Sequence, residues 1–129
     1  GVLYVGRRVP PEIEDDFEAG KETKKVSLKL LKPGGAPGEV WRANNPFLIQ
    51  RVFPPGARLY APGQGYDLVE HPALPEAEPM KLKSKMNITV HPVIGTDRVW
   101  VWVCDNYLIM DSGVSDCLHR TPQQIFAVG

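Results

Sequence analysis

The chain has 129 residues, which fits one domain able to bury its own core, so we expect a single domain over residues 1–129. Fifteen basic and fifteen acidic residues give a formal net charge of zero. This balance argues against general nucleic-acid binding, which needs a strongly basic face. The 13 prolines and 12 glycines separate short apolar runs, and this favours strands joined by turns over long helices.

The start of the chain is predicted to contain one short helix. Residues 12–19 are rich in acids, which are typical of a helix N-terminus, and they follow two prolines. Ile13 and Phe17 stand four residues apart, as on one helical face, and Gly20 is expected to end the helix. Residues 21–25 are then predicted to be a polar link.

Short apolar runs bounded by turn signals predict a series of strands through the middle of the chain. The expected strands cover residues 26–31, 39–43, 47–53, 58–61 and 66–70. Between them, residues 32–38 and the sequence Asn44-Asn45-Pro46 are typical of loops and turns. The glycine-rich loop lacks the Lys-Ser/Thr pair of a phosphate-binding loop, and no helix is expected after it.

Residues 80–91 alternate between apolar and polar side chains, which predicts a strand with one buried and one wet face. The wet face would include three lysines, Lys81, Lys83 and Lys85. We interpret them as a solvated strand face and as the candidate binding surface for a protein or an anionic lipid. The sequence Asn87-Ile88-Thr89 matches a glycosylation acceptor, but it lies in this strand and is taken as chance.

Residues 99–104 are apolar on both faces, so this strand is expected to be covered on both sides. Trp100 and Trp102 are predicted to be core residues, with a ligand platform as the alternative role. Cys104 is predicted to be a buried free thiol. Two cysteines are too few for a disulfide framework, and a Cys104–Cys117 bridge is the alternative to free thiols.

Residues 111–116 form a polar bend and residues 125–128 a last strand in this interpretation. Together the pattern predicts an all-β fold, an antiparallel β-sandwich or small barrel of about seven to nine strands with at most one short helix near residues 12–19. No apolar run approaches the roughly 20 residues of a membrane span, and no signal-peptide pattern is present. A cytoplasmic protein is expected.

No set of residues predicts a catalytic centre, a metal site or a cofactor. Cys117 and His119 are the tightest candidate pair for a cysteine nucleophile and its base, but the known local signatures of cysteine proteases are absent. The same two residues are too few for zinc, which takes three or four ligands. We therefore expect a protein that is not an enzyme and needs no cofactor, with a cysteine hydrolase using Cys117 and His119 as an alternative.

Several motifs, in order along the chain, resemble a small accessory domain of kinetoplastid calpain-like proteins. They lie at residues 6–9, 17–20, 41–45, 52–61 and 88–92, the last of which reads Ile-Thr-Val-His-Pro. The resemblance covers nearly the whole chain, although residues 95–97 and 106–107 depart from the pattern of the family. It implies a non-catalytic, protein-interaction module with protein partners at the cytoskeleton or the membrane periphery. It assigns no functional residues.

A second resemblance is to the Ran-binding domain, through the sequence Asp97-Arg98-Val99-Trp100-Val101-Trp102. It implies a pleckstrin-like domain that binds a small GTPase. The C-terminal helix and the upstream tryptophan signature of that domain have no counterpart in this chain. The GTPase-binding domain is therefore kept as an alternative function.

Overall fold

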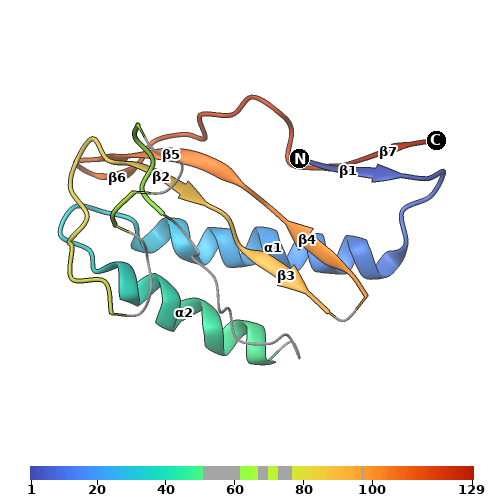
Figure 1. Cartoon of the computed structure of the whole chain (residues 1–129), viewed down its shortest axis with the longest axis horizontal. Helices are drawn as coiled ribbons and strands as arrows, with labels where there is room; N and C mark the ends of the chain where they lie inside the picture. Colours follow the sequence, from blue (N-terminus) through green and yellow to red (C-terminus); the bar gives the residue numbers. More distant parts are fainter. Residues whose placement is uncertain (51–61, 67–69, 73–76, 97) are drawn as a thin grey trace.

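The computed structural model describes residues 1–50, 62–66, 70–72, 77–96 and 98–129. The strand predicted for residues 58–61 lies outside this part, as do residues 51–53 and 67–69 of the strands predicted for 47–53 and 66–70. The described residues form a mixed α/β fold in which the helices α1 (Pro11–Leu30) and α2 (Pro37–Gln50) cover one face of a twisted sheet (Figure 1). The predicted all-β sandwich or barrel is therefore wrong. The error comes from the first half of the chain, where two long helices replace the predicted short helix and strands.

Helix α1 continues through the predicted polar link and through the predicted strand at residues 26–31. Proline occupies its first turn, where no backbone N–H is needed, and Glu12 and Glu14 lie near its positive end. Gly20 does not end the helix, which continues to Leu30. A Cβ atom at this position would lie 3.0 Å from Val103 Cγ2. Glycine at this position lets the helix approach the sheet closely.

Helix α2 includes the predicted strand around Trp41, the predicted turn Asn44-Asn45-Pro46 and the first part of the predicted strand at residues 47–53. It also follows the glycine-rich loop after which no helix was expected. Asn44 is buried and donates from Nδ2 to the Val40 carbonyl at 2.7 Å and to Ser27 Oγ at 2.9 Å. The asparagine therefore joins the two helices, and its partner in α1 could not be read from local sequence.

Two antiparallel pairs of strands continue one another to form the sheet. Strand β2 (Asn87–Val90) pairs with β5 (Asp105–Met110), and β6 (Gly113–Val114) extends this pair. Strand β3 (Val93–Gly95) pairs with β4 (Trp100–Trp102), and the Val103 N–H donates to the Pro92 carbonyl where the two pairs meet. The polar bend expected at residues 111–116 contains the turn that leads into β6.

A separate parallel ribbon joins the two ends of the chain. Strand β1 (Val2–Val5) pairs with β7 (Ile125–Val128), so the strand predicted at residues 125–128 is confirmed. The ribbon and both termini lie together at one end of the molecule (Figure 1). In the described part of the chain, no helix is both long enough and apolar enough to cross a membrane.

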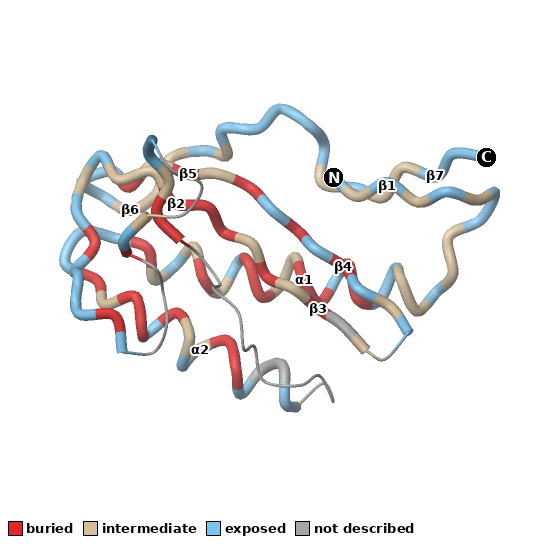
Figure 2. The backbone as a smooth tube through the Cα atoms, viewed as in Figure 1, coloured by how far each residue is buried: buried red, intermediate tan, exposed pale blue. Residues whose placement is uncertain are grey.

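The core lies between the helices and one face of the sheet (Figure 2). Side chains on this inner face are almost completely buried, and they alternate with side chains on the opposite, outer face. The buried set from the sheet comprises Ile88, Val90, Ile94, Val101, Val103, Tyr107 and Ile109. Neither α1 nor α2 covers the outer face, so its side chains are the ones from which the described part of the chain could form a binding site.

Candidate functional site

On the outer face, side chains of neighbouring strands lie opposite one another in pairs, and the pairs at one end of the sheet contain tryptophan. Asn106 lies opposite Thr89, Trp102 opposite Val93, and Trp100 opposite Gly95. His91 and Cys104 occupy the junction between these pairs. Trp100 is 64% exposed and Trp102 is 50% exposed, so the prediction that both tryptophans belong to the core is wrong. Their alternative role as a ligand platform fits this exposure.

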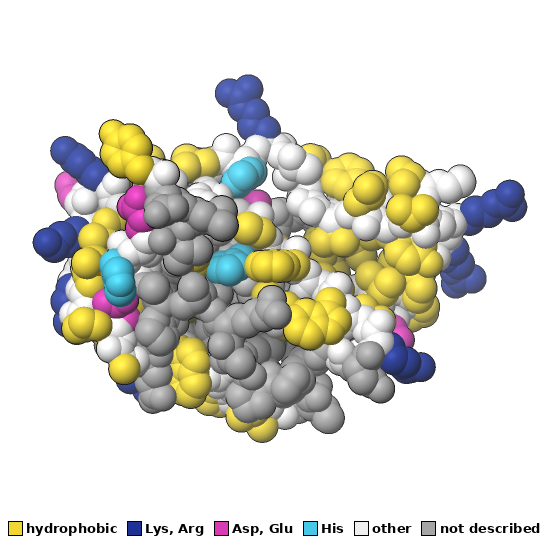
Figure 3. Space-filling view, in the orientation of Figure 1, with side chains coloured by type: hydrophobic (Ala, Val, Ile, Leu, Met, Phe, Trp, Pro, Cys, Tyr) yellow, Lys and Arg dark blue, Asp and Glu magenta, His cyan; other side chains and the backbone are white. Residues whose placement is uncertain are grey.

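Trp102 is held in place by His91. The two rings are stacked, with centroids 5.6 Å apart and planes 19° from parallel. The Trp102 indole Nε1–H donates to His91 Nδ1 at 3.0 Å. Near the centre of the face seen in Figure 3, a histidine side chain lies against a hydrophobic one. Trp102, held by His91, therefore presents an apolar surface in a fixed orientation.

The bond from Trp102 also sets the protonation of His91. Because Nδ1 accepts a hydrogen bond, the neutral ring carries its proton on Nε2. Burial lowers the pKa of His91 below its usual value, which favours the neutral ring at neutral pH. Among the described residues, the buried Nε2 has no hydrogen-bond partner.

The lowered pKa of His91 predicts that the protein loses stability as the pH falls. In the range between the folded pKa and the unfolded value near 6.5, the unfolded chain binds more protons, so acid favours unfolding. We expect the free energy of unfolding to fall between pH 7.5 and 5.5, and to fall less steeply in His91→Gln. Urea denaturation across this range checks the result, and parallel curves for the two proteins would contradict it.

Asn106 is the centre of a polar cluster on the same face. Its Nδ2 donates to Thr89 Oγ1 at 2.9 Å and also contacts the side-chain oxygens of Gln64 and Asn87. Its Oδ1 bonds the exposed His119 ring through Nε2 at 2.9 Å. The outer face therefore has a polar end, at the Asn106 cluster, and an aromatic end, at Trp102 and Trp100.

Cys104 is an exposed side chain of the outer face, so the prediction that it is buried is wrong. Both Cys104 and Cys117 are free, and the alternative disulfide is absent. Partial burial of its sulfur, with a smaller contribution from Asp105, raises the pKa of the Cys104 thiol. A raised pKa disfavours the reactive thiolate, so the site gives no sign of an activated nucleophile.

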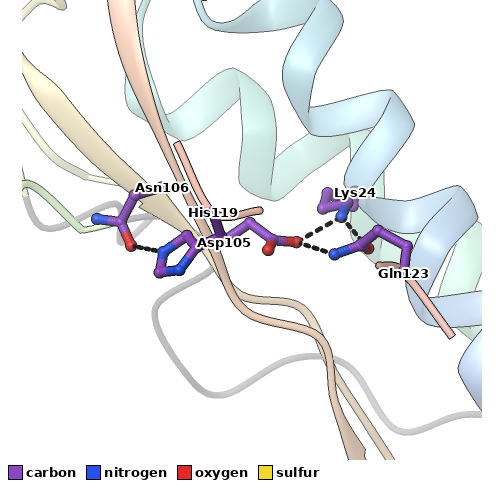
Figure 4. Close-up of polar contacts among 5 residues, drawn as sticks. All are labelled: Lys24, Asp105, Asn106, His119 and Gln123. Atoms are coloured by element: carbon purple, nitrogen blue, oxygen red, sulfur yellow. Dashed lines mark hydrogen bonds and ion pairs between the residues drawn. The ribbon is translucent and has the colours of Figure 1, made fainter. Parts of the chain in front are cut away.

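The inner face of β5 holds a buried ion pair. Lys24 Nζ lies 2.6 Å from Asp105 Oδ2, and Gln123 donates from Nε2 to the same oxygen at 2.6 Å. Gln123 Oε1 also accepts a hydrogen bond from Lys24. Asp105 and Asn106 point to opposite sides of β5, each with its own partners (Figure 4). The network fixes α1 and the C-terminal segment to the strand that carries the outer face.

The structure separates Cys117 from His119. Cys117 packs against the core close to Tyr107, whose pKa is raised first by burial and then by the neighbouring Cys117. His119 bonds Asn106, whose side chain lies on the other face of β5. The cysteine hydrolase using Cys117 and His119 is therefore not supported by the geometry.

The predicted lysine face is not part of a strand. Residues 80–86 precede β2, and the Leu82 backbone bonds the loop between the helices through the N–H of Gly34 and the carbonyl of Gly35. Lys81, Lys83 and Lys85 are exposed in this segment. Their use as a binding surface stays a prediction. In the described ranges, no group of three or more His, Cys, Asp or Glu side chains could hold a metal ion.

This arrangement of helices and sheet matches the pita-bread fold of peptidases. No protein-family model matches the chain, and no curated protein sequence matches it. A solved X-Pro aminopeptidase from Thermotoga maritima is similar, with a TM-score of 0.86 and 19% identity over 98% of this chain and 36% of that chain. A prolidase from Thermococcus sibiricus gives a TM-score of 0.84 and 18% identity over 98% of this chain and 34% of that chain.

A methionine aminopeptidase from Rickettsia prowazekii is also similar, with a TM-score of 0.71 and 15% identity over 87% of this chain and 54% of that chain. The chain thus spans about a third of the length of the first two proteins and about half of the third. At these identities the likeness establishes the fold.

These neighbours overturn the sequence-based hypotheses about family and function. The resemblance to a calpain-like accessory domain is wrong, because the fold is that of peptidases. The expectation of a non-catalytic module is contradicted for the same reason, and the pleckstrin-like GTPase-binding domain has no support either. The expected cytoskeletal or membrane-associated partners likewise find no support among them.

Sequence reasoning missed the polar cluster around Asn106. A signal for part of it was present, since Asn87, Thr89 and His91 alternate with buried residues and share one face of the predicted strand. Gln64 and His119 gave no signal, because only the folded chain brings them to Asn106.

Proposed function

We propose that this chain forms part of a peptide-hydrolysing enzyme of the pita-bread fold and that its outer face binds the peptide. The observation that carries the proposal is the outer face itself, which carries the exposed Trp100 and Trp102 at one end and the polar cluster of Asn106 at the other. Exposed aromatic side chains beside a few oriented polar groups are typical of a binding site. The likeness in fold to several peptidases supports peptides as the ligand class.

Peptides that contain proline are the first substrates to test. Two similar structures are named as an X-Pro aminopeptidase and a Xaa-Pro dipeptidase. Aromatic side chains are also the usual partners of proline rings in peptide recognition. The proposed contribution of the outer face is to bind and orient the peptide.

The proposal predicts that the full-length protein releases amino acids from Ala-Pro, Ala-Pro-Phe or Met-Ala-Ser, measured by chromatography. Replacing both Trp100 and Trp102 with alanine should lower kcat/KM by about tenfold or more, because apolar contact with the peptide is lost. Ile49→Ala is the matched control, since Ile49 is 55% exposed on α2, away from the outer face. Absence of cleavage of every peptide, or equal kcat/KM in the control and the double variant, would contradict the proposal.

We also infer a cytoplasmic location, because free Cys104 and Cys117 suit a reducing compartment. Cell fractionation tests this, and recovery of the protein in a secreted fraction would contradict it.

A further inference from the structure

Trp102 is an exposed side chain whose orientation is nevertheless fixed. The stack on His91 sets the plane of the indole, and the hydrogen bond from Nε1 to Nδ1 sets its rotation within that plane. Even so, half of the side chain remains open to solvent. An aromatic side chain held in this way loses little conformational freedom when a ligand covers it, and this favours binding.

Trp100 supplies a second aromatic surface beside it. Alternate residues of a strand project from the same face at a spacing of about 6.6 Å, so the two indoles are neighbours on the outer face. Of the two indoles, Trp102 is the one that contacts His91, both by stacking and by its Nε1–H hydrogen bond.

Resting on the proposed function, we propose that Trp102 contacts an apolar ring of the bound peptide and that His91 is the positioning residue that holds the indole for this contact. His91 acts through Trp102, so its replacement should affect the peptides that carry such a ring. In the peptides proposed above, proline is the residue that carries such an apolar ring. His91 and Trp102 together would thus set the preference among peptide substrates.

Steady-state kinetics of the full-length protein with Ala-Pro and Ala-Gly test the inference. In His91→Leu, which removes both the stack and the acceptor, we expect KM for Ala-Pro to rise about tenfold while kcat stays within about twofold. The KM for Ala-Gly should change by less than about threefold, because that peptide has no ring to lose contact with. His91→Gln keeps an acceptor for the indole N–H and should lie between wild type and His91→Leu.

The Trp102 indole N–H gives an independent readout by NMR. Its hydrogen exchange should be slow in the wild type, faster in His91→Leu, and partly restored in His91→Gln. If His91→Leu changes the KM of both peptides equally or of neither, while the wild type still cleaves them, the positioning role is overturned and the proposed function stands. If the wild type neither binds nor cleaves any peptide, the proposed function fails and the inference fails with it.

Discussion

Replacement of Lys24 by methionine is expected to lower the free energy of unfolding by about 3–5 kcal/mol. The Lys24 side chain is 8% exposed and the Asp105 side chain 2% exposed, so their ion pair is shielded from water. Methionine fills a similar volume but leaves the Asp105 carboxylate buried without its cation. Gln123 still donates one hydrogen bond to this carboxylate, which does not replace a full charge.

Lys21→Met is the matched control for this prediction, because Lys21 is on the same helix and pairs with Glu18 at 2.7 Å in a more exposed setting. Its loss should cost less than about 1 kcal/mol. The double variant Lys24→Met with Asp105→Leu should recover much of the stability, since an apolar pair can replace a buried ion pair. Urea denaturation of the wild type and these three variants measures the free energies of unfolding. Equal losses in Lys24→Met and Lys21→Met would show that the buried ion pair contributes no more to stability than the exposed one.

The two halves of the chain differ in how well the sequence predicts them. After residue 86 the alternation of side chains is a better guide, since β2, β4 and β7 lie within predicted strands, although β3 and β5 were not predicted. In the first half the same kind of pattern gave a wrong prediction, because an alternation of only five residues, 26–30, is compatible with either a strand or a helix. Burial of Ser27 and Leu31, four residues apart, belongs to the helical pattern. Only packing against α2 and the sheet decides that these residues form a helix and not a strand.

The candidate site depends still more on contacts between distant residues. Lys24 and Asp105 are 81 positions apart, and Asn106 and Gln64 are 42 positions apart. No local pattern connects such residues. The exposure of Trp100 and Trp102 was also beyond the sequence, because an apolar face predicts burial unless the layers of the fold are known. The alternation in this strand matches the structure, and the error was to expect burial of the side chains on both of its faces.

Val101→Asp is the second large effect that we expect. Val101 is 2% exposed and packs with Phe17 and Val103 on the inner face. A carboxylate at this position would be buried without a cation, so the free energy of unfolding should fall by at least about 4 kcal/mol, and the variant should be largely unfolded at 25 °C. Circular dichroism and urea denaturation measure the loss.

Trp100→Asp places the same charged residue one position earlier, on the outer face. Because Trp100 is 64% exposed, this change should cost less than about 1 kcal/mol. If Val101→Asp lowers the free energy of unfolding much more than Trp100→Asp does, one face of β4 is covered and the other is open. Equal and severe costs would mean that both faces are covered, and the outer face would then have no room for a peptide.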